Sequence, residues 1–564
     1  MGVYKIDINT VKSLDETDLP RVIRYLLLME ELQPKDFSVC SNTKDPDGGV
    51  DAIIQKEKKE PLESFIPSTQ TVFQLKATEM SPKQCATEIN CSAHNFLRDK
   101  LVQGYDFVVV SSKNNISEEK KENRKQAMQE ELNKIGASLT KPVFLDADDL
   151  QSWINQYQNV IFQLRPDLLR TFISVNAKNF NEWNNVAGTN SFQYDDKLEQ
   201  LVNDIKNHIL QNPVSHISGL AGIGKTRTVL EACNRMSEKD KLRIVYIPKA
   251  EDLKALLQFI RTLDFNESHI LIIDECDKDY LDSIKYELVN SNITLVTIDY
   301  DSYDNHNELK FSKLSNAVIE AIIQQIAPEL DHHVRLAIAR VADGFPRFAI
   351  DISEKIKTAL SRGDDIQFWG GNDRDIYKLL LRDRTNRYDQ SKIDVLMVLS
   401  LFSKIGCMPG MRRLSLTERY RGKYLADPNE INEIIDVFGL NKDKVFEAYN
   451  EFCSRDIIQQ RGLSISVQPF PLAVHLTKQW KTQTHPENII QFYNKLSSSL
   501  QERFIKKVKY LNDARDFAEF LIGSKDTPFS NAELLNSPSN ELFGQLAEIA
   551  PDLAMKSLQY AFEG

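Results

Sequence analysis

The stretch GLAGIGKT, residues 219–226, decides the fold of the middle of this chain. It fits the pattern G-x-x-x-x-G-K-[ST], in which a glycine-rich turn joins a strand to a helix. The flanking residues provide that context, because SHIS (215–218) is typical of a strand and TRTVLEAC (226–233) of a helix. A chance glycine-rich turn is the alternative, and it does not account for the strand and helix on either side.

The chemistry of this loop predicts that the chain binds ATP with Mg²⁺. Glycines let successive backbone N–H groups turn towards phosphate oxygens, and the following helix presents its positive N-terminal end. Lys225 is expected to reach the β- and γ-phosphates, and the Thr226 hydroxyl to bind Mg²⁺. The predicted nucleotide contacts within the loop are Gly219, Gly222, Ile223, Gly224, Lys225 and Thr226.

An acidic motif, HILIIDECD (269–277), follows further along the chain. Its apolar residues predict a buried strand that ends at Asp274, where a carboxylate can hold Mg²⁺ through water beside the loop threonine. Glu275 is placed to polarise the attacking water. The next predicted strand ends near Thr297 and Asp299. A polar residue there could sense the γ-phosphate, and a solvated strand end is the alternative.

Composition excludes several classes of protein. The 564 residues are 41% hydrophobic and 27% charged, so several domains can each bury a core. The net charge of −11 does not indicate a nucleic-acid binder, although a local basic groove is compatible with it. Seven scattered cysteines without a CxxC pair predict neither a disulfide framework nor a zinc site, and favour a reducing cytoplasmic setting. No apolar run approaches the roughly 20 residues of a membrane helix.

The predicted fold class is multidomain α/β. Strands that alternate with helices over residues 1–170 indicate a layered α/β domain, and the Asn-rich stretch within 171–194 a linker. Residues 195–360 alternate strands and helices around the phosphate loop. Residues 361–485 are expected to be mainly helical and to end in a winged helix, and 486–564 to be all-α.

A polar cluster is predicted within the first domain. DPDGGVDAII (45–54) is typical of a turn and a short apolar strand that contains Asp51, and VFQLKA (72–77) of a second strand. Gln74 and Lys76 project from one face of that strand. If the strands pair, an aspartate and an amide oxygen can hold Mg²⁺ while the lysine stabilises charge on a phosphodiester. The alternative is a structural aspartate and a lysine that extends to solvent.

The phosphate loop, the IIDECD strand and the GFPRFAI turn (344–350) together resemble the STAND class of NTPases, a switch-like branch of the AAA+ superfamily. The resemblance implies that Pro346 packs on the nucleotide and that Arg227 is the arginine that commonly follows the loop threonine. It also implies that His475, in PLAVHLTKQW, lies against the bound diphosphate from a winged helix. The residues around His475 depart from the usual motif, and a structural core histidine is the alternative.

The arrangement D-G-G-V-D…Q-x-K, which contains Asp51, Gln74 and Lys76, resembles the Mrr-type branch of the PD-(D/E)xK endonucleases. That branch has glutamine in place of the first acidic residue of the ExK element. The resemblance implies a restriction-endonuclease-like domain with these three active-site residues, and Asp51 as a magnesium ligand. Many relatives carry a glutamate near the start of the first helix, where this chain has Pro20 and Arg21.

The two resemblances cover about residues 1–480, and their combination is similar to the Avs family of bacterial antiviral STAND NTPases. This implies a chain that senses a phage protein of the portal or terminase class through C-terminal helical repeats. It further implies a homo-oligomer on activation, a tetramer by family resemblance, that cleaves double-stranded DNA. The tail ELFGQLAEIAPDLAMKSLQYAF (541–562) resembles the start of such repeats, and the array itself is absent from these 564 residues.

Two other functions remain open at the level of the sequence. One is a STAND transcriptional or signalling regulator whose N-terminal domain binds DNA without cutting it, and Mg²⁺-dependent cleavage distinguishes the two. The other is a restriction motor that moves along DNA. The sequence shows one phosphate loop and no second nucleotide-binding core, which counts against the motor.

Overall fold

The computed structural model describes most of the chain, as two compact units. The described residues are 4–30, 32–41, 49–62, 65–90, 94–188, 191–249, 252–276, 278–299, 307–361, 377, 380–381, 389–407, 429–461, 463–511, 514–523 and 539–563. The first unit comprises Met1–Phe192, Leu201–Ser218 and Thr226–Leu309, and the second comprises Gln193–Gln200, Gly219–Lys225 and Lys310–Gly564. Parts of the helical region expected over 361–485 lie outside the described residues.

The first unit begins with a five-stranded mixed sheet of order β1-β2-β3-β4-β5. Its strands are β1 (Phe37–Val39), β2 (Ala52–Gln55), β3 (Gln70–Lys76), β4 (Asp106–Ser111) and β5 (Pro142–Leu145). β2 is antiparallel to both of its neighbours, whereas β3, β4 and β5 run parallel. All of β4 is buried, as expected for a strand covered on both faces.

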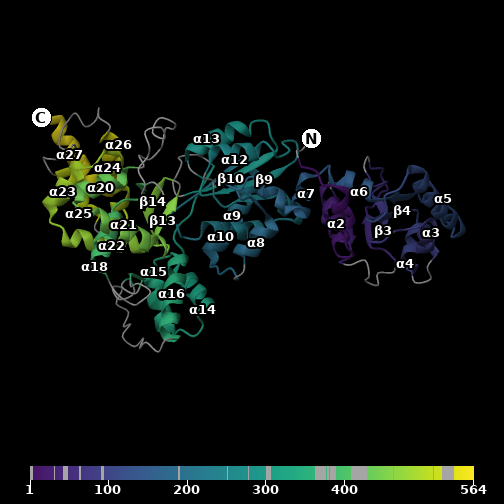
Figure 1. Cartoon of the computed structure of the whole chain (residues 1–564), viewed down its shortest axis with the longest axis horizontal. Coiled ribbons are helices and arrows are strands. Elements are labelled where there is room, and N and C mark those ends of the chain that lie inside the picture. The colour runs from purple at the N-terminus through teal and green to yellow at the C-terminus, as the bar shows by residue number, and fades with distance from the viewer. Residues whose placement is uncertain are drawn as a thin grey trace. The chain divides into compact units, whose positions relative to one another are not determined.

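Helices cover both faces of this sheet (Figure 1). Alternate residues of β3 and β4 point into two separate cores, Phe73 and Val108 into one and Val72 and Phe107 into the other. The first core is closed by α1 (Ile8–Ser13), α2 (Asp18–Met29) and α6 (Ala147–Ile154), and the second by α3 (Pro82–Asn90), α4 (Asn95–Val102) and α5 (Glu118–Lys134). The predicted layered α/β arrangement of these residues is present.

A second sheet has six strands in the order β11-β7-β10-β9-β8-β6. The strands are β6 (Lys178–Asn179), β7 (Val214–Ser218), β8 (Ile244–Ile247), β9 (His269–Asp274), β10 (Ile293–Asp299) and β11 (Glu308–Lys310). β7, β10, β9 and β8 are parallel. The phosphate-loop strand β7 and the acidic strand β9 therefore end at the same edge of the sheet, with β10 between them.

Two groups of helices cover the second sheet (Figure 1). One face carries α8 (Phe180–Ala187), α9 (Asp196–Gln211) and α10 (Lys225–Asn234), and the other carries α12 (Leu253–Ile260) and α13 (Lys278–Glu287). Apolar strand residues alternate between the two cores, with Ile270 and Ile272 on the first face and Leu271 and Ile273 on the second. A sheet buried on both faces explains the continuous apolar run of β9.

The structure differs from the linker expected within 171–194. β6 adds an antiparallel strand to the sheet beside β8, and α8 buries Phe180 and Trp183 in its core. These two aromatic residues are three positions apart and so lie on one face of the helix. The many asparagines around them, one of which caps α8 through Asn179, conceal this short apolar stripe in the sequence.

Helix α7 (Gln158–Leu164) belongs to both sheets. Its residues Val160 and Ile161 lie in the core of the first sheet, and Phe162 lies in the core of the second. The carboxylate of Glu267 accepts the backbone N–H groups of Gln158 and Asn159 at 2.6 and 3.1 Å, at the N-terminus of this helix. Burial raises the pKa of Glu267 to about 7.

The second unit is mainly helical. It contains α14 (Asn316–Ile326), α15 (His332–Ala342), α16 (Pro346–Ser361), α18 (Gln390–Leu399), α20 (Glu430–Phe438), α21 (Lys442–Cys453), α22 (Phe470–Gln483), α23 (Pro486–Lys495), α24 (Ser498–Val508), α25 (Ala514–Gly523), α26 (Ser539–Ile549) and α27 (Pro551–Glu563). A small antiparallel sheet has the order β12 (Ile405–Gly406), β14 (Ser464–Val467), β13 (Ile458–Arg461). Residues 441–476, where the sequence predicts helix, turn, helix and then a strand pair, contain one helix, α21, followed by β13, β14 and the start of α22.

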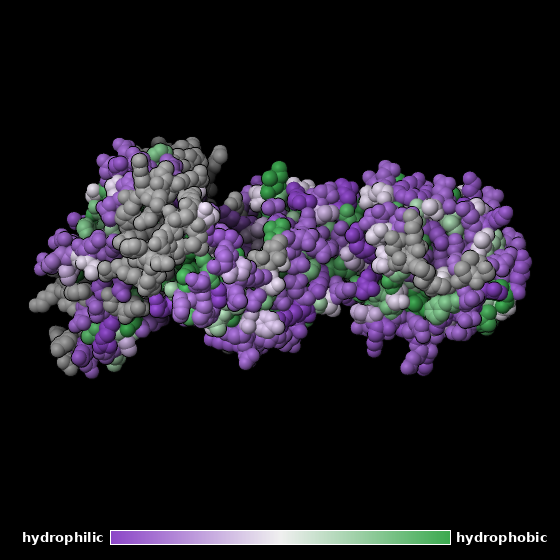
Figure 2. Space-filling model, turned by 90° about the horizontal axis from the view of Figure 1, so that it is seen from below, coloured by the Kyte–Doolittle hydropathy of each residue, from purple (hydrophilic) through white to green (hydrophobic). Residues whose placement is uncertain are grey.

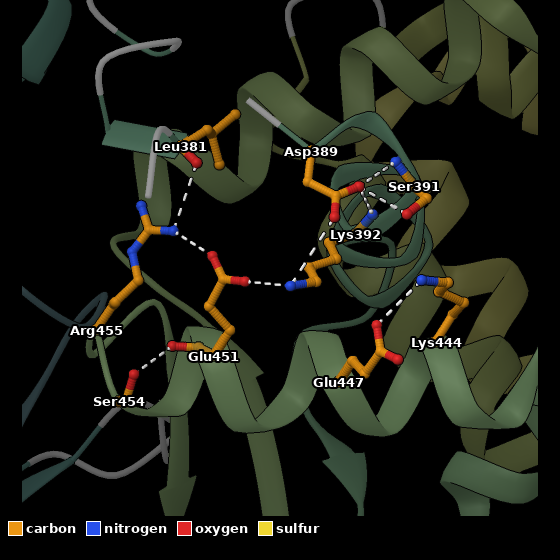
Figure 3. Close-up of polar contacts among 9 residues, drawn as sticks. All are labelled: Leu381, Asp389, Ser391, Lys392, Lys444, Glu447, Glu451, Ser454 and Arg455. Carbon is orange, nitrogen blue, oxygen red and sulfur yellow. Dashed lines mark hydrogen bonds and ion pairs between the residues drawn. The ribbon is translucent and has the colours of Figure 1, made fainter. Parts of the chain in front are cut away.

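A polar network joins α18 to α21 (Figure 3). The Glu451 carboxylate accepts from Lys392 at 2.7 Å and from Arg455 at 2.9 Å. Arg455 also donates to the backbone oxygen of Leu380 at 2.6 Å. Two cations on one carboxylate fix the packing of these helices, which lie beside the small sheet.

The face shown in Figure 2 is mainly hydrophilic, with apolar residues in scattered patches. Among the helices that the structure describes, none combines the length and the apolar character needed to cross a bilayer.

Candidate functional site

The phosphate loop follows β7 directly and depends on glycine. Gly222 and Gly224 have φ angles of +81° and +101°, which side chains with a Cβ rarely adopt. At Gly219 a Cβ would lie only 2.9 Å from the backbone oxygen of Phe311. Ile223 is buried and anchors the turn. The ammonium of Lys225 donates to the backbone oxygens of Gly219 and Leu220, at 2.6 and 2.9 Å.

Asp274 is the acidic residue at the edge of the sheet where β9 ends. Its Oδ2 accepts the Thr226 hydroxyl at 2.6 Å, and its Oδ1 accepts the backbone N–H of Glu275 at 2.9 Å. The Asp274 side chain is almost fully buried, with the residue 9% exposed. A hydroxyl and a carboxylate in contact are the oxygen donors that Mg²⁺ uses in nucleotide sites, so this pair suits the ion.

Glu275 has a left-handed backbone conformation, with a φ angle of +50°. This conformation costs about 1–2 kcal/mol for a residue other than glycine. The next amide, Cys276 N–H, donates to the oxygen of Ile298 at 3.3 Å and so ties the strained turn to β10. Such strain is typical of functional positions, which agrees with a role for Glu275 in handling the attacking water.

Two aromatic residues next to Asp274 were not predicted from the sequence. The hydroxyl of Tyr246, on β8, donates to Asp274 Oδ2 at 3.2 Å. The indole of Trp183 stacks on the Tyr246 ring, with the centroids 4.1 Å apart and the planes 6° from parallel. Burial raises the pKa of Tyr246, so its hydroxyl stays protonated. An apolar strand IVYI with a tyrosine at its third position gives no local sign of this contact.

The other residues predicted near this edge have partners of their own. The Thr297 hydroxyl lies 2.7 Å from Nδ1 of His216, and both residues are buried. Asp299 is the last residue of β10. Arg227 pairs with Glu231 at 3.5 Å, and its guanidinium lies 5.1 Å from the centroid of the Phe192 ring.

In the second unit, Pro346 begins α16 beside the phosphate loop. A Cβ added at Gly224 would lie 3.5 Å from Pro346 Cγ, which is ordinary van der Waals contact. The preceding Phe345 lies next to Gly222 and stacks on Phe470. The proline of the GFPRFAI turn is therefore adjacent to the loop that carries the predicted phosphate site.

Phe470 is also contacted by the region that follows α22. The ammonium of Lys507 lies 4.3 Å from the centroid of the Phe470 ring, and Tyr510 meets the same ring edge-on at 5.0 Å. Burial lowers the pKa of Lys507 to about 7. A continuous row of contacts thus leads from the phosphate loop through Phe345 and Phe470 to the end of α24.

His475 lies on α22 and is half-buried. Its ring stacks on that of Tyr377, with the centroids 3.9 Å apart and the planes 13° from parallel. Tyr377 in turn stacks on Phe348 of α16. The histidine therefore has the packing of a core residue on one of its faces, and its contact with a diphosphate remains a prediction.

In the N-terminal domain, the two predicted strands pair, and the pairing places Asp51 across from the part of β3 that carries Gln74 and Lys76. Ala52 is opposite Phe73 in the antiparallel register of β2 and β3. Oδ2 of Asp51 accepts the Leu75 N–H at 2.6 Å, and Asp51 is 3% exposed. The Gln74 amide donates to the backbone oxygen of Gly49, while its Oε1 is buried with no hydrogen-bond partner among the described residues.

Lys76, at the end of β3, has an acidic neighbour that the sequence did not indicate. Its ammonium lies 3.1 Å from the carboxylate of Glu88 on α3. His94 donates through Nδ1–H to the backbone oxygen of Glu88 at 2.8 Å, and its ring packs where a Cβ on Gly49 would be. Glu88 lies on α3, the helix that follows β3 in the sequence. Its proximity to Lys76 therefore follows from the packing of α3 on the sheet.

These residues provide oxygen donors for a hard cation. The buried Gln74 Oε1, with no hydrogen-bond partner among the described residues, and the buried Asp51 carboxylate are such donors, and an unpaired buried oxygen costs about 1–3 kcal/mol unless a ligand satisfies it. Within the described ranges, no three or more His, Cys, Asp or Glu side chains cluster as a metal cage. The site therefore fits a magnesium ion that also binds water or substrate oxygens.

Comparisons with solved structures find matches at low identity and low TM-score. No protein-family model matches the chain, and no curated protein does. Among solved structures, Thermotoga maritima RuvB, a Holliday junction branch migration motor, is 17% identical, with 52% of this chain and 95% of that chain covered and a TM-score of 0.27. A STAND protein with a tetratricopeptide-repeat sensor from Pyrococcus horikoshii is 14% identical, with 64% and 58% covered and a TM-score of 0.25. Drosophila ORC bound to DNA is 13% identical, with 50% and 86% covered and a TM-score of 0.26.

Proposed function

We propose that this chain is a STAND-type ATPase in which ATP and Mg²⁺ at the phosphate loop control a nuclease in the N-terminal domain. The single observation that carries the proposal is the 2.6 Å hydrogen bond between Thr226 and Asp274. It brings together the loop hydroxyl and the strand-end carboxylate that a magnesium–nucleotide site requires.

Each residue of the proposed ATP site has a definite task. Backbone N–H groups of the loop and the ammonium of Lys225 bind phosphate oxygens. Thr226 and Asp274 hold Mg²⁺, which when bound neutralises charge on the phosphates. The carboxylate of Glu275 orients the attacking water and accepts its proton.

For the N-terminal domain, we propose cleavage of double-stranded DNA. Asp51 and Gln74 hold Mg²⁺, and Lys76 stabilises negative charge that develops on the phosphodiester. The ion pair with Glu88 keeps the Lys76 ammonium at the end of β3. The support is the convergence of these side chains on paired strands, together with the resemblance of their motif to Mrr-type nucleases.

Control of the nuclease is proposed from the resemblance to antiviral STAND NTPases. A phage protein of the portal or terminase class acts through the helical region after α22, and the chain then assembles as a homo-oligomer, a tetramer by resemblance. Symmetric assembly pairs nuclease sites, which cleavage of both strands requires. The elements from α20 to β14 serve in this proposal as the winged helix of the switch.

The test uses the full chain with labelled ATP, linear duplex DNA, Mg²⁺ and a panel of purified portal and terminase proteins. We expect ATP binding that Lys225→Ala abolishes, and cutting, with at least one phage protein, that Asp51→Ala abolishes. DNA binding without cutting in the presence of Mg²⁺ would favour a STAND transcriptional or signalling regulator instead. Failure of the wild-type chain to bind ATP would contradict the proposal as a whole.

A further inference from the structure

We infer that Tyr246 is a positioning residue for the carboxylate of Asp274, and that Trp183 holds Tyr246 in place. The inference rests on the ATP–Mg²⁺ site proposed above. It assigns a task to two residues that lie outside the phosphate loop and outside the acidic strand, one on β8 and one on α8.

The first argument is the hydrogen bonding of the Asp274 carboxylate. Oδ2 accepts two hydroxyl groups, from Thr226 at 2.6 Å and from Tyr246 at 3.2 Å, while Oδ1 accepts a backbone N–H. Thr226 is itself a proposed magnesium ligand, so its oxygen has a second task. Tyr246 is the side chain in this set whose hydroxyl only orients the carboxylate.

The second argument is the stack that fixes the phenol. Trp183 and Tyr246 are 2% and 6% exposed, and their rings are nearly parallel at 4.1 Å. A tyrosine hydroxyl lies on the axis of its ring, so a fixed ring fixes the position of the oxygen. Aromatic stacking of this kind adds to the stability gained from burial itself.

The third argument concerns why Trp183 occupies this place. Its indole N–H is buried without a hydrogen-bond acceptor among the residues that the structure describes. The ring is therefore placed by stacking rather than by its polar group. Helix α8 is also tied to α10, the helix that follows the phosphate loop, because Asn234 donates to Asn184 at 3.2 Å.

Removal of the Tyr246 hydroxyl is expected to lower the affinity for Mg²⁺ and to leave the Mg²⁺-independent binding of ATP unchanged. A residue that orients a metal ligand typically changes metal affinity by about 10- to 100-fold when it is removed. Tyr246→Phe keeps the ring and the stack but deletes the hydroxyl. We expect the Mg²⁺ concentration for half-maximal binding of labelled ATP to rise about ten-fold, with binding measured in EDTA unchanged.

Three variants separate positioning from a structural role. Trp183→Ala should reproduce the shift of Tyr246→Phe, and Trp183→Phe, which keeps an aromatic ring, should lessen it. Tyr286→Phe is the matched control, because Tyr286 is 82% exposed on α13 and should show wild-type behaviour. Addition of Mg²⁺ to the ATP-bound chain should change tryptophan emission, and that change should be lost in Trp183→Phe, which retains Trp153, Trp369 and Trp480.

An unchanged Mg²⁺ requirement in Tyr246→Phe would overturn the inference while ATP binding by the wild-type chain stands. An equal loss of ATP affinity with and without Mg²⁺ would also overturn it, since that result indicates a structural residue. A wild-type chain that binds ATP without any dependence on Mg²⁺ would instead remove both the inference and the magnesium site on which it rests.

Discussion

The rings of Phe345 and Phe470 stack with their centroids 5.5 Å apart and their planes 18° from parallel. Phe345 belongs to the turn beside the phosphate loop, and Phe470 begins α22, where Lys507 and Tyr510 cover its ring. We therefore expect a change at the loop to be transmitted to the helices after α22 through these two aromatic rings.

Phe470→Leu should weaken this connection and leave the fold intact, because a large apolar side chain is retained and such exchanges cost less than about 1.5 kcal/mol. We expect ATP to alter amide hydrogen exchange in α24 of the wild-type chain and to alter it less in the variant. Phe446→Leu, at a residue 47% exposed on α21, is the control. The same ATP response in Phe470→Leu as in the wild type would contradict the connection.

Lys225→Ala should abolish ATP binding, because the loop loses the ammonium that neutralises phosphate charge. Charge-assisted hydrogen bonds contribute about 1.5–3 kcal/mol each, so a loss of roughly 100-fold or more in affinity is expected. Titration with a fluorescent ATP analogue measures it. Wild-type affinity in the variant would remove the phosphate-loop assignment.

Glu275→Gln should separate binding from hydrolysis. The amide retains the size of the carboxylate but cannot accept a proton, and loss of a general base typically slows a reaction by about 10²- to 10⁴-fold. We expect ATP affinity within a few-fold of wild type, and ATP turnover slowed by that factor. The release of phosphate measures the turnover. If the variant cannot bind ATP, the left-handed turn at Glu275 has a structural role instead.

In the N-terminal domain, Asp51→Ala and Lys76→Ala should each abolish Mg²⁺-dependent DNA cutting without a change in ATP affinity. Gln74→Glu should be tolerated, since a carboxylate oxygen replaces the amide oxygen as a ligand. Lys83→Ala, at an exposed lysine on α3, should cut as the wild type does. Full nicking of plasmid DNA by the activated Lys76→Ala chain would refute the proposed active site.

The raised pKa of Glu267 predicts that the stability of the folded chain depends on pH. Burial raises its pKa from 4.5 to about 7 in the folded chain, so the folded state holds the proton more tightly. Its contribution to stability is complete below pH 4.5 and is lost as the pH rises to about 7, a change of up to about 3 kcal/mol. The melting temperature of the wild type should therefore fall more between pH 5 and pH 8 than that of Glu267→Gln.

Wild type and Glu267→Gln must be compared at each pH, because the titration of His269 changes the stability in the opposite direction. Burial lowers the pKa of His269 to about 4, so its contribution is complete above 6.5 and is lost as the pH falls to about 4. The His269 contribution is common to both chains and cancels in the difference. An identical pH profile for Glu267→Gln and wild type would contradict the raised pKa.

The sequence predicts those parts of the site that depend on local pattern. The loop glycines, Thr226 and Asp274 lie within continuous motifs, and the structure brings the last two into contact. The strand that follows Asp51 and the strand that contains Gln74 were predicted from local pattern, and their pairing, which the sequence left as a condition, is present in the structure. Local pattern does not report which side chain of a distant helix or strand packs against a motif, so neither Glu88 nor Tyr246 could be found in this way.

The helix that contributes to both cores has a consequence for the modularity of the chain. Val160 and Ile161 pack in the core of the first sheet, and Phe162 packs in the core of the second. The connection between the two sheets is therefore a helix that both cores share, not a flexible linker. A protein engineered to carry a different N-terminal domain could not simply be spliced at this point. The incoming domain would have to provide its own equivalent of α7, with a partner for Glu267, or leave apolar surface of the second sheet open to solvent.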